Sequence, residues 1–104
     1  MDYNIIITEN AENELDRYIR YLLFEIRSEQ AARNLLADFE ETVQMLKSVA
    51  GSLKTCENRR LKEQGYKRIK FKRHGYFMLF RVEENDVIVD ALFHELQDYE
   101  NKIE

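Results

Sequence analysis

The sequence predicts an α+β fold in which an antiparallel helix hairpin packs on one face of a mainly antiparallel sheet. Three observations support this fold class. Residues 2–8, "DYNIIIT", form a short β-branched run typical of a strand. Residues 11–46 carry apolar side chains at helical spacing in two stretches with a short break between them. Residues 66–93 contain period-two patterns, so strands and helices are segregated along the chain.

The first strand puts isoleucines of residues 5–7 on both of its faces, so we expect both faces to be covered. Thr8 is a plausible N-cap for the first helix, whose apolar stripe runs over residues 11–26. Ser28 is the cap expected for the second helix, which should close near Gly51 as a C-cap. The short connection between the helices predicts an antiparallel hairpin.

The remaining elements follow a polar segment, residues 51–65, which we interpret as a long loop. A loop of this length in a compact domain hints at a functional segment. The three strands expected after it span residues 66–72, 76–82 and 87–93, with "EEND" as the turn between the last two. "HELQDYENKIE" then has the composition of a short C-terminal helix.

Length and composition indicate one soluble domain, residues 1–104, with 16 basic and 20 acidic side chains and a net charge of −4. No apolar run approaches the roughly 18 residues that a membrane span needs. The N-terminus lacks the basic region of a signal peptide. Cys56 is the single cysteine, so no internal disulfide can form, which fits a reducing cytoplasm. We therefore expect a cytoplasmic protein with no membrane contact.

The positive charge is concentrated in one segment. Residues 54–74 hold nine Lys or Arg and two Glu, whereas the rest of the chain holds seven basic and 18 acidic side chains. Arg68, Lys70 and Lys72 alternate with Ile69 and Phe71, so one strand face presents cations about 6.5–7 Å apart. A polyanion or an acidic partner protein would fit this face. An ordinary solvated outer face is the alternative.

Other chemistry has weaker support. Cys56, His74 and His94 lack the spacing of metal ligands, and three scattered glycines exclude a phosphate loop, so we expect no metal and no cofactor. His94 follows the last strand, and in a helical tail it could hydrogen-bond Asp98. A histidine there could perform acid–base catalysis, although a strand-end histidine more often only satisfies its local hydrogen bonds.

The segments "TENAENELDRYIRYL", "YKRIKFKRHGYFMLFRV" and "VIVDALFHELQDYE", in this order, resemble the RelE/ParE toxins of bacterial type II toxin–antitoxin modules. The resemblance covers nearly the whole chain, and its sharpest parts are Gly75-Tyr76 and the spacing of His94 and Asp98. It implies a growth inhibitor neutralised by a small cognate antitoxin, with operator DNA bound only through that antitoxin.

The resemblance also implies two mechanisms. RelE-type members cut mRNA on the ribosome, and ParE-type members are described as inhibitors of DNA gyrase. On the RelE mechanism, the candidate catalytic residues are His94, Arg68 and Lys70. The candidate RNA- or target-binding residues are Lys67, Lys72, Arg73, His74, Arg81 and Tyr99.

The chain departs from the RelE pattern at positions where that pattern has arginines, namely Phe77, Leu96 and Gln97. Losing one such electrostatic group typically costs about 10²–10³ in rate. Our first hypothesis is a ribosome-dependent mRNA endonuclease, and the second is a gyrase inhibitor without chemistry of its own. The third is a decayed toxin that only binds its antitoxin. Whether the chain is an enzyme stays open at this point.

Overall fold

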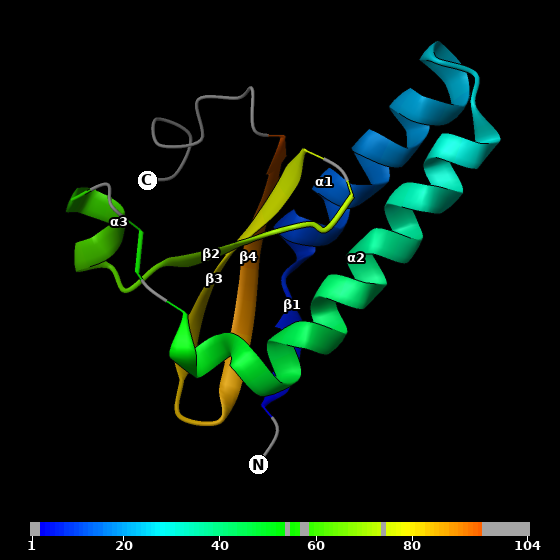
Figure 1. Cartoon of the computed structure of the whole chain (residues 1–104). Coiled ribbons are helices and arrows are strands. Elements are labelled where there is room, and N and C mark those ends of the chain that lie inside the picture. Colours follow the sequence, from blue (N-terminus) through cyan, green and yellow to red (C-terminus); the bar gives the residue numbers. More distant parts are fainter. Residues whose placement is uncertain (1–2, 54, 57–58, 74, 95–104) are drawn as a thin grey trace.

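The computed structural model describes residues 3–53, 55–56, 59–73 and 75–94. Its sheet has the strand order β1-β4-β3-β2 (Figure 1). The strands are β1 (Asn4–Ile7), β2 (Lys67–Lys70), β3 (Tyr76–Glu83) and β4 (Asp86–His94). β1 pairs with β4 in parallel, and the other two pairs are antiparallel. The predicted α+β class with a mainly antiparallel sheet is therefore confirmed.

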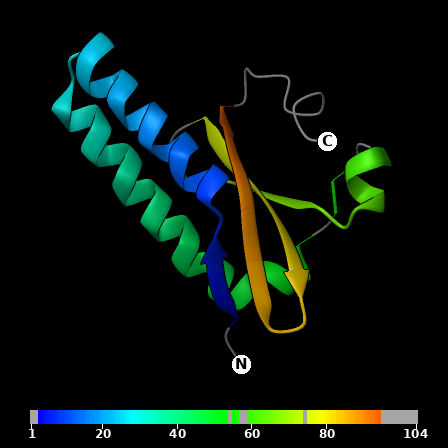
Figure 2. The ribbon, with the colours of Figure 1, turned by 180° about the vertical axis from the view of Figure 1, so that it is seen from behind.

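The helix hairpin consists of α1 (Glu9–Arg20), a π-helical turn (Tyr21–Glu25) and α2 (Glu29–Val49). Both predicted N-caps are confirmed. The Thr8 hydroxyl accepts a hydrogen bond from the Ala11 amide at 3.2 Å, and the Ser28 hydroxyl accepts one from Ala31 at 3.1 Å. Figures 1 and 2 show α1 and α2 side by side and antiparallel, as the short connection predicts.

We call the side of the sheet that packs against the hairpin the helix face. The main core lies there, where the sheet contributes Met78, Phe80, Val87, Val89 and Leu92. The hairpin contributes the buried side chains Ala11, Leu35 and Leu46. Apolar residues at helical spacing meet apolar residues on one face of the strands, which is the arrangement that buries both patterns together.

We call the opposite side of the sheet the basic face. A second, smaller cluster lies on it, formed by Cys56, Leu61, Phe77, Leu79, Ala91 and Phe93. Leu61 belongs to α3 (Arg59–Glu63), a short helix in the segment that the sequence analysis interprets as a loop. The expectation of a loop is wrong there, because one buried leucine and Cys56 anchor the segment to the sheet.

Two further expectations are wrong, one about the covering of both faces of β1 and one about the end of α2. Ile6 is 45% exposed, since β1 is an edge strand and the second cluster lies over β3 and β4. Gly51 is not a left-handed C-cap, because α2 ends in a 3₁₀ turn, Ala50–Ser52. A Cβ at Gly51 would lie 2.1 Å from the Tyr3 hydroxyl oxygen, so a close approach explains this glycine better than a cap does.

The C-terminal helix was expected from His94 onward. His94 is the last residue of β4, and residues 95–104 lie outside the described residues. No described helix is both long and apolar enough to span a bilayer.

Candidate functional site

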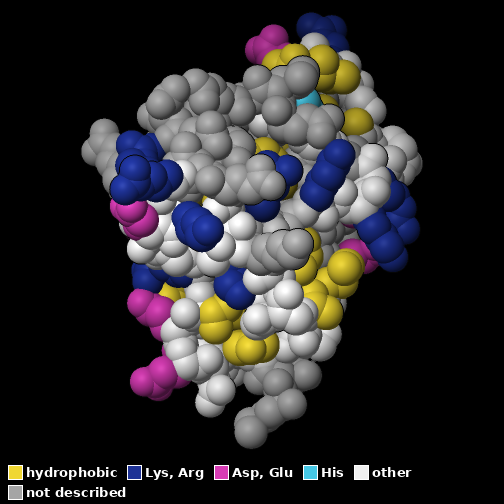
Figure 3. Space-filling view, turned by 60° about the vertical axis from the view of Figure 1, so that its left-hand side comes forward, with side chains coloured by type: hydrophobic (Ala, Val, Ile, Leu, Met, Phe, Trp, Pro, Cys, Tyr) yellow, Lys and Arg dark blue, Asp and Glu magenta, His cyan; other side chains and the backbone are white. Residues whose placement is uncertain are grey.

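The basic face carries two of the three cations expected in a row on one strand, Arg68 and Lys70, whereas Lys72 lies beyond the end of β2 and is not part of the row. Ile69 and Phe71 are buried toward the helix face, whereas Arg68 and Lys70 are exposed on the opposite side. Arg68 pairs with Leu79 and Lys70 with Phe77, both of which belong to the second cluster. Figure 3 shows Lys and Arg side chains scattered over the side of the molecule that carries α3 and β2.

Phe77, which takes the place of an arginine in the RelE pattern, is part of this second cluster. It is buried and stacks on Phe93 with 5.9 Å between ring centroids. The Arg68 guanidinium lies over the Phe77 ring, 5.1 Å from its centroid, in a cation–π contact. Phe77 therefore packs beneath Arg68 on the basic face and contributes no charge to that face.

Three of the candidate binding residues bind other parts of the chain. The Lys67 ammonium donates to the carbonyls of Leu53 at 2.7 Å and Gly51 at 3.4 Å. The Arg73 guanidinium pairs with Glu41 of α2 at 3.0 Å. These contacts tie the start of β2 and the bend after β2 to α2 and to the residues that follow α2.

Arg81 is the third such residue, and its contacts centre on Asp90. The Asp90 carboxylate accepts hydrogen bonds from Arg81 Nε and from the Tyr66 hydroxyl, each at 3.0 Å. The Asp90 hydrogen bond raises the pKa of Arg81, and burial followed by the Asp90 contact raises the pKa of Tyr66. Arg81 stays positive and Tyr66 stays neutral at physiological pH, so this network keeps one fixed charge pattern.

Lys72 is exposed in the bend after β2. His74 and Tyr99 lie outside the described residues.

His94 is the last residue of β4, and its ring lies on the helix face. It meets Tyr76 edge to face with 5.0 Å between centroids. Leu92 belongs to the main core on the helix face, and Phe93 belongs to the second cluster on the basic face. Because successive strand residues alternate between faces, His94 projects to the helix face. His94 is thus separated by the sheet from Arg68 and Lys70, the other two candidate catalytic residues.

A β-bulge determines this placement. Leu79 pairs with Ala91 and Phe80 with Val89, so Asp90 is an extra residue in β4. Strict alternation from Val87 would put His94 on the basic face, whereas the bulge moves it to the helix face.

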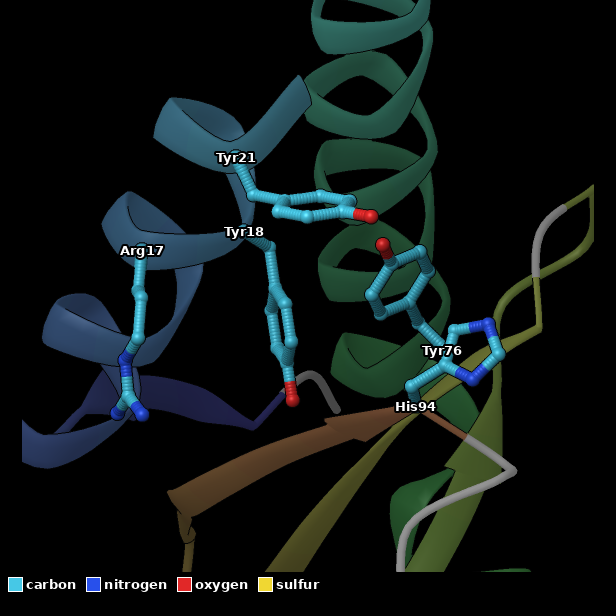
Figure 4. A pocket seen from close by; sticks show the side chains of 5 residues that line it. All are labelled: Arg17, Tyr18, Tyr21, Tyr76 and His94. Atoms are coloured by element: carbon cyan, nitrogen blue, oxygen red, sulfur yellow. The ribbon is translucent and has the colours of Figure 1, made fainter. Parts of the chain in front are cut away.

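His94 lines an open pocket of about 400 Å³ at this end of the sheet, together with Arg17, Tyr18, Tyr21 and Tyr76 (Figure 4). Tyr18 and Tyr76 are in edge-to-face contact with 4.9 Å between centroids. This pocket is not predicted from the sequence. The helical spacing of residues 17, 18 and 21 is a signal, but only the strand register brings them to Tyr76 and His94.

No group of three or more potential metal ligands occurs among the described residues.

Comparison with known proteins defines the class. The family model described as "ParE toxin of type II toxin-antitoxin system, parDE" matches residues 5–99. The fold is similar to a chain of the chromosomal ParDE toxin–antitoxin system from P. aeruginosa, with a TM-score of 0.72 and 20% identity over 88% of this chain and 95% of that one. It is also similar to a chain of the toxin–antitoxin complex RelBE2 from Mycobacterium tuberculosis, with a TM-score of 0.61 and 18% identity over 90% of this chain and 99% of that one. No curated protein sequence matches.

The fold and the family match together define a toxin of a type II toxin–antitoxin system. Within that class, the chain belongs to the ParE toxin family. The suspected RelE/ParE resemblance is therefore confirmed.

Proposed function

We propose that this toxin inhibits growth by binding a target protein, in the manner described for ParE-type inhibitors of DNA gyrase, and not by cutting mRNA. We propose further that a cognate acidic antitoxin neutralises it by covering the basic face. The observation that carries the mechanism is the separation of His94 from Arg68 and Lys70 by the sheet.

Cleavage of RNA by its own ribose hydroxyl needs a proton-transfer group and cations around one phosphate. A general acid or base acts within about 3 Å of the atom it protonates or deprotonates. A phosphate on the basic face within reach of Arg68 would have the sheet between it and His94. The burial of Phe77 removes a further electrostatic contribution at the place where the RelE pattern has an arginine.

The exposed cations on the basic face suit an acidic protein surface. Electrostatic complementarity of this kind accelerates association and makes it sensitive to salt. The endonuclease hypothesis keeps one supporting observation, which is that Arg68 and Lys70 are both exposed on the same face.

The test compares two readouts after induction of the wild-type chain. We expect inhibition of DNA supercoiling by gyrase in vitro and no new mRNA ends by primer extension on translating ribosomes. New cleavage ends that disappear in His94→Ala would contradict the proposal and restore the endonuclease hypothesis. Absence of both effects would leave only the antitoxin-binding hypothesis.

The antitoxin is tested separately by co-expression with the product of the adjacent reading frame, which we expect to be a small acidic protein. We expect the two chains to co-purify, with association that slows as salt concentration rises. Isolation of the toxin alone and active from such cells would contradict a cognate partner.

A further inference from the structure

The pocket between α1 and the end of the sheet lies on the helix face, apart from the basic face, and the proposed function does not use it. We infer that it binds a nucleoside monophosphate, either free or as one unit of a polynucleotide. The base would lie against the rings of Tyr76 and His94, and the phosphate would lie at Arg17.

The shape and size of the pocket support a small planar ligand. Its volume of about 400 Å³ falls within the usual range for small-molecule sites, which is about 300–1,000 Å³. Four of its five lining residues are aromatic, counting the imidazole. Aromatic side chains bind bases by stacking, because every base has a π-face.

The rings are fixed in place before any ligand arrives. Tyr76 contacts both Tyr18 and His94 edge to face, so the three rings form one continuous wall. The Tyr18 hydroxyl donates to the Leu92 carbonyl at 3.4 Å, which anchors that ring to β4. A pre-formed wall loses little conformational entropy on binding, and this favours affinity.

The polar groups of the pocket suit a phosphate. Arg17 is the only Lys or Arg among the residues that line the pocket. No described residue forms an ion pair with it. A guanidinium binds phosphate with two parallel hydrogen bonds. Figure 4 shows Arg17 on the far side of the Tyr18 ring from Tyr76, so a ligand reaching both would span that ring.

The phenols remain neutral hydrogen-bonding groups. Burial raises the pKa of Tyr18 to about 12 and also raises the pKa of Tyr76. The Glu14 carboxylate interacts electrostatically with Tyr18 and accepts hydrogen bonds from Asn10 Nδ2 at 3.1 Å and from the Leu92 amide at 3.4 Å. The Glu14 charge disfavours a phosphate beside Tyr18, whereas the Arg17 guanidinium has the opposite effect there.

The test is a titration of the isotope-labelled, purified chain with each of the four ribonucleoside monophosphates, followed by NMR chemical shifts. We expect saturating shifts at the pocket residues. Arg17→Ala should weaken binding of the monophosphate by roughly tenfold or more, the usual effect of losing a charged hydrogen bond, and leave binding of the free nucleoside unchanged.

The matched control is Arg20→Ala on the same helix. Arg20 pairs with Asp16 and does not line the pocket, so this variant should bind as the wild type does. A dinucleotide that binds more tightly than the monophosphate would identify a polynucleotide as the source of the ligand, and equal affinity would identify the free nucleotide.

Three results would overturn the inference. The first is absence of saturation up to about 5 mM ligand, which would mean a binding free energy weaker than about 3 kcal/mol. The second is equal binding by the Arg17→Ala and Arg20→Ala variants. The third is displacement of the nucleotide by inorganic phosphate at equal concentration, which would indicate an adventitious ion only.

Discussion

The two faces of the sheet differ in what their side chains do. The helix face buries large apolar residues against a long hairpin, and Met78, Phe80 and Leu92 have almost no exposed surface there. The basic face buries a smaller cluster under a five-residue helix and leaves Arg68 and Lys70 exposed around it. The difference indicates that the helix face supplies most of the stability, whereas the basic face buries less apolar surface and leaves cations exposed.

The largest expected effect concerns the main core. Phe80→Ala should lower the free energy of unfolding by about 3–5 kcal/mol, because it removes a fully buried ring and leaves a cavity. Phe77→Ala, the matched change on the basic face, should cost less because its cluster is smaller. Urea denaturation of both variants measures the difference, and a larger loss for Phe77→Ala would reverse the comparison.

The next effect concerns the bulged residue that connects the two faces. The Asp90 carbonyl accepts hydrogen bonds from Asn10 Nδ2 at 2.9 Å and Thr8 Oγ1 at 3.2 Å, while its carboxylate binds Arg81 and Tyr66 on the basic face. Asp90→Ala keeps the carbonyl and removes only the carboxylate contacts, so it should cost about 1–2 kcal/mol, less than a fully buried charged hydrogen bond, since the site is partly exposed.

Asp86→Ala is the control for Asp90→Ala. Asp86 lies at the other end of β4 and accepts one exposed hydrogen bond from Asn4 at 3.3 Å. Its loss should change stability by less than about 0.5 kcal/mol. Equal losses for the two variants in thermal unfolding would mean that the Asp90 network adds nothing.

The bulge also explains which part of the site the sequence could predict. Periodicity correctly predicts the hairpin, both N-caps and the exposure of Arg68 and Lys70, because each depends on neighbours within one or two turns. The face on which His94 lies depends on one extra residue, and that residue is stabilised by partners from α1 and from β3. Strict alternation contains no information about such an insertion.

The pocket could not be predicted from the sequence either, because it depends on contacts between residues far apart in the chain. Arg17 and Tyr18 are separated from Tyr76 and His94 by more than fifty residues, and the pairing of β1, β4 and β3 in one sheet brings them together. The prediction of a loop over residues 51–65 was wrong at α3, because a single buried leucine, Leu61, gives no periodic signal.

A smaller effect concerns alkaline pH. Burial raises the folded-state pKa of Tyr18 from 10.0 to about 12, so the neutral phenol stabilises the fold below pH 10 and this contribution is lost as pH rises toward 12. In Tyr18→Phe, the decline of stability with pH should be shallower by at most about 1.4 kcal/mol per pH unit, and by less because the ring is partly exposed. Urea denaturation between pH 9 and pH 12 measures the slope. An unchanged slope would show that Tyr18 ionises equally easily in both states.

Among the test variants, leaving the controls aside, the smallest effect on stability should accompany the largest effect on function. Arg68→Ala combined with Lys70→Ala removes two exposed cations and one cation–π contact, so the free energy of unfolding should fall by only about 0.5–1 kcal/mol. If the basic face is the contact surface, the double variant should lose growth inhibition and bind an acidic antitoxin more weakly.

The matched control is Arg20→Ala with Arg33→Ala, which removes the same charge from exposed ion pairs on the hairpin. Growth curves at equal expression, with circular dichroism to verify folding, separate the two outcomes. Full toxicity of the Arg68 and Lys70 variant would place the working surface elsewhere, whereas equal loss in both variants would reduce the effect to net charge alone.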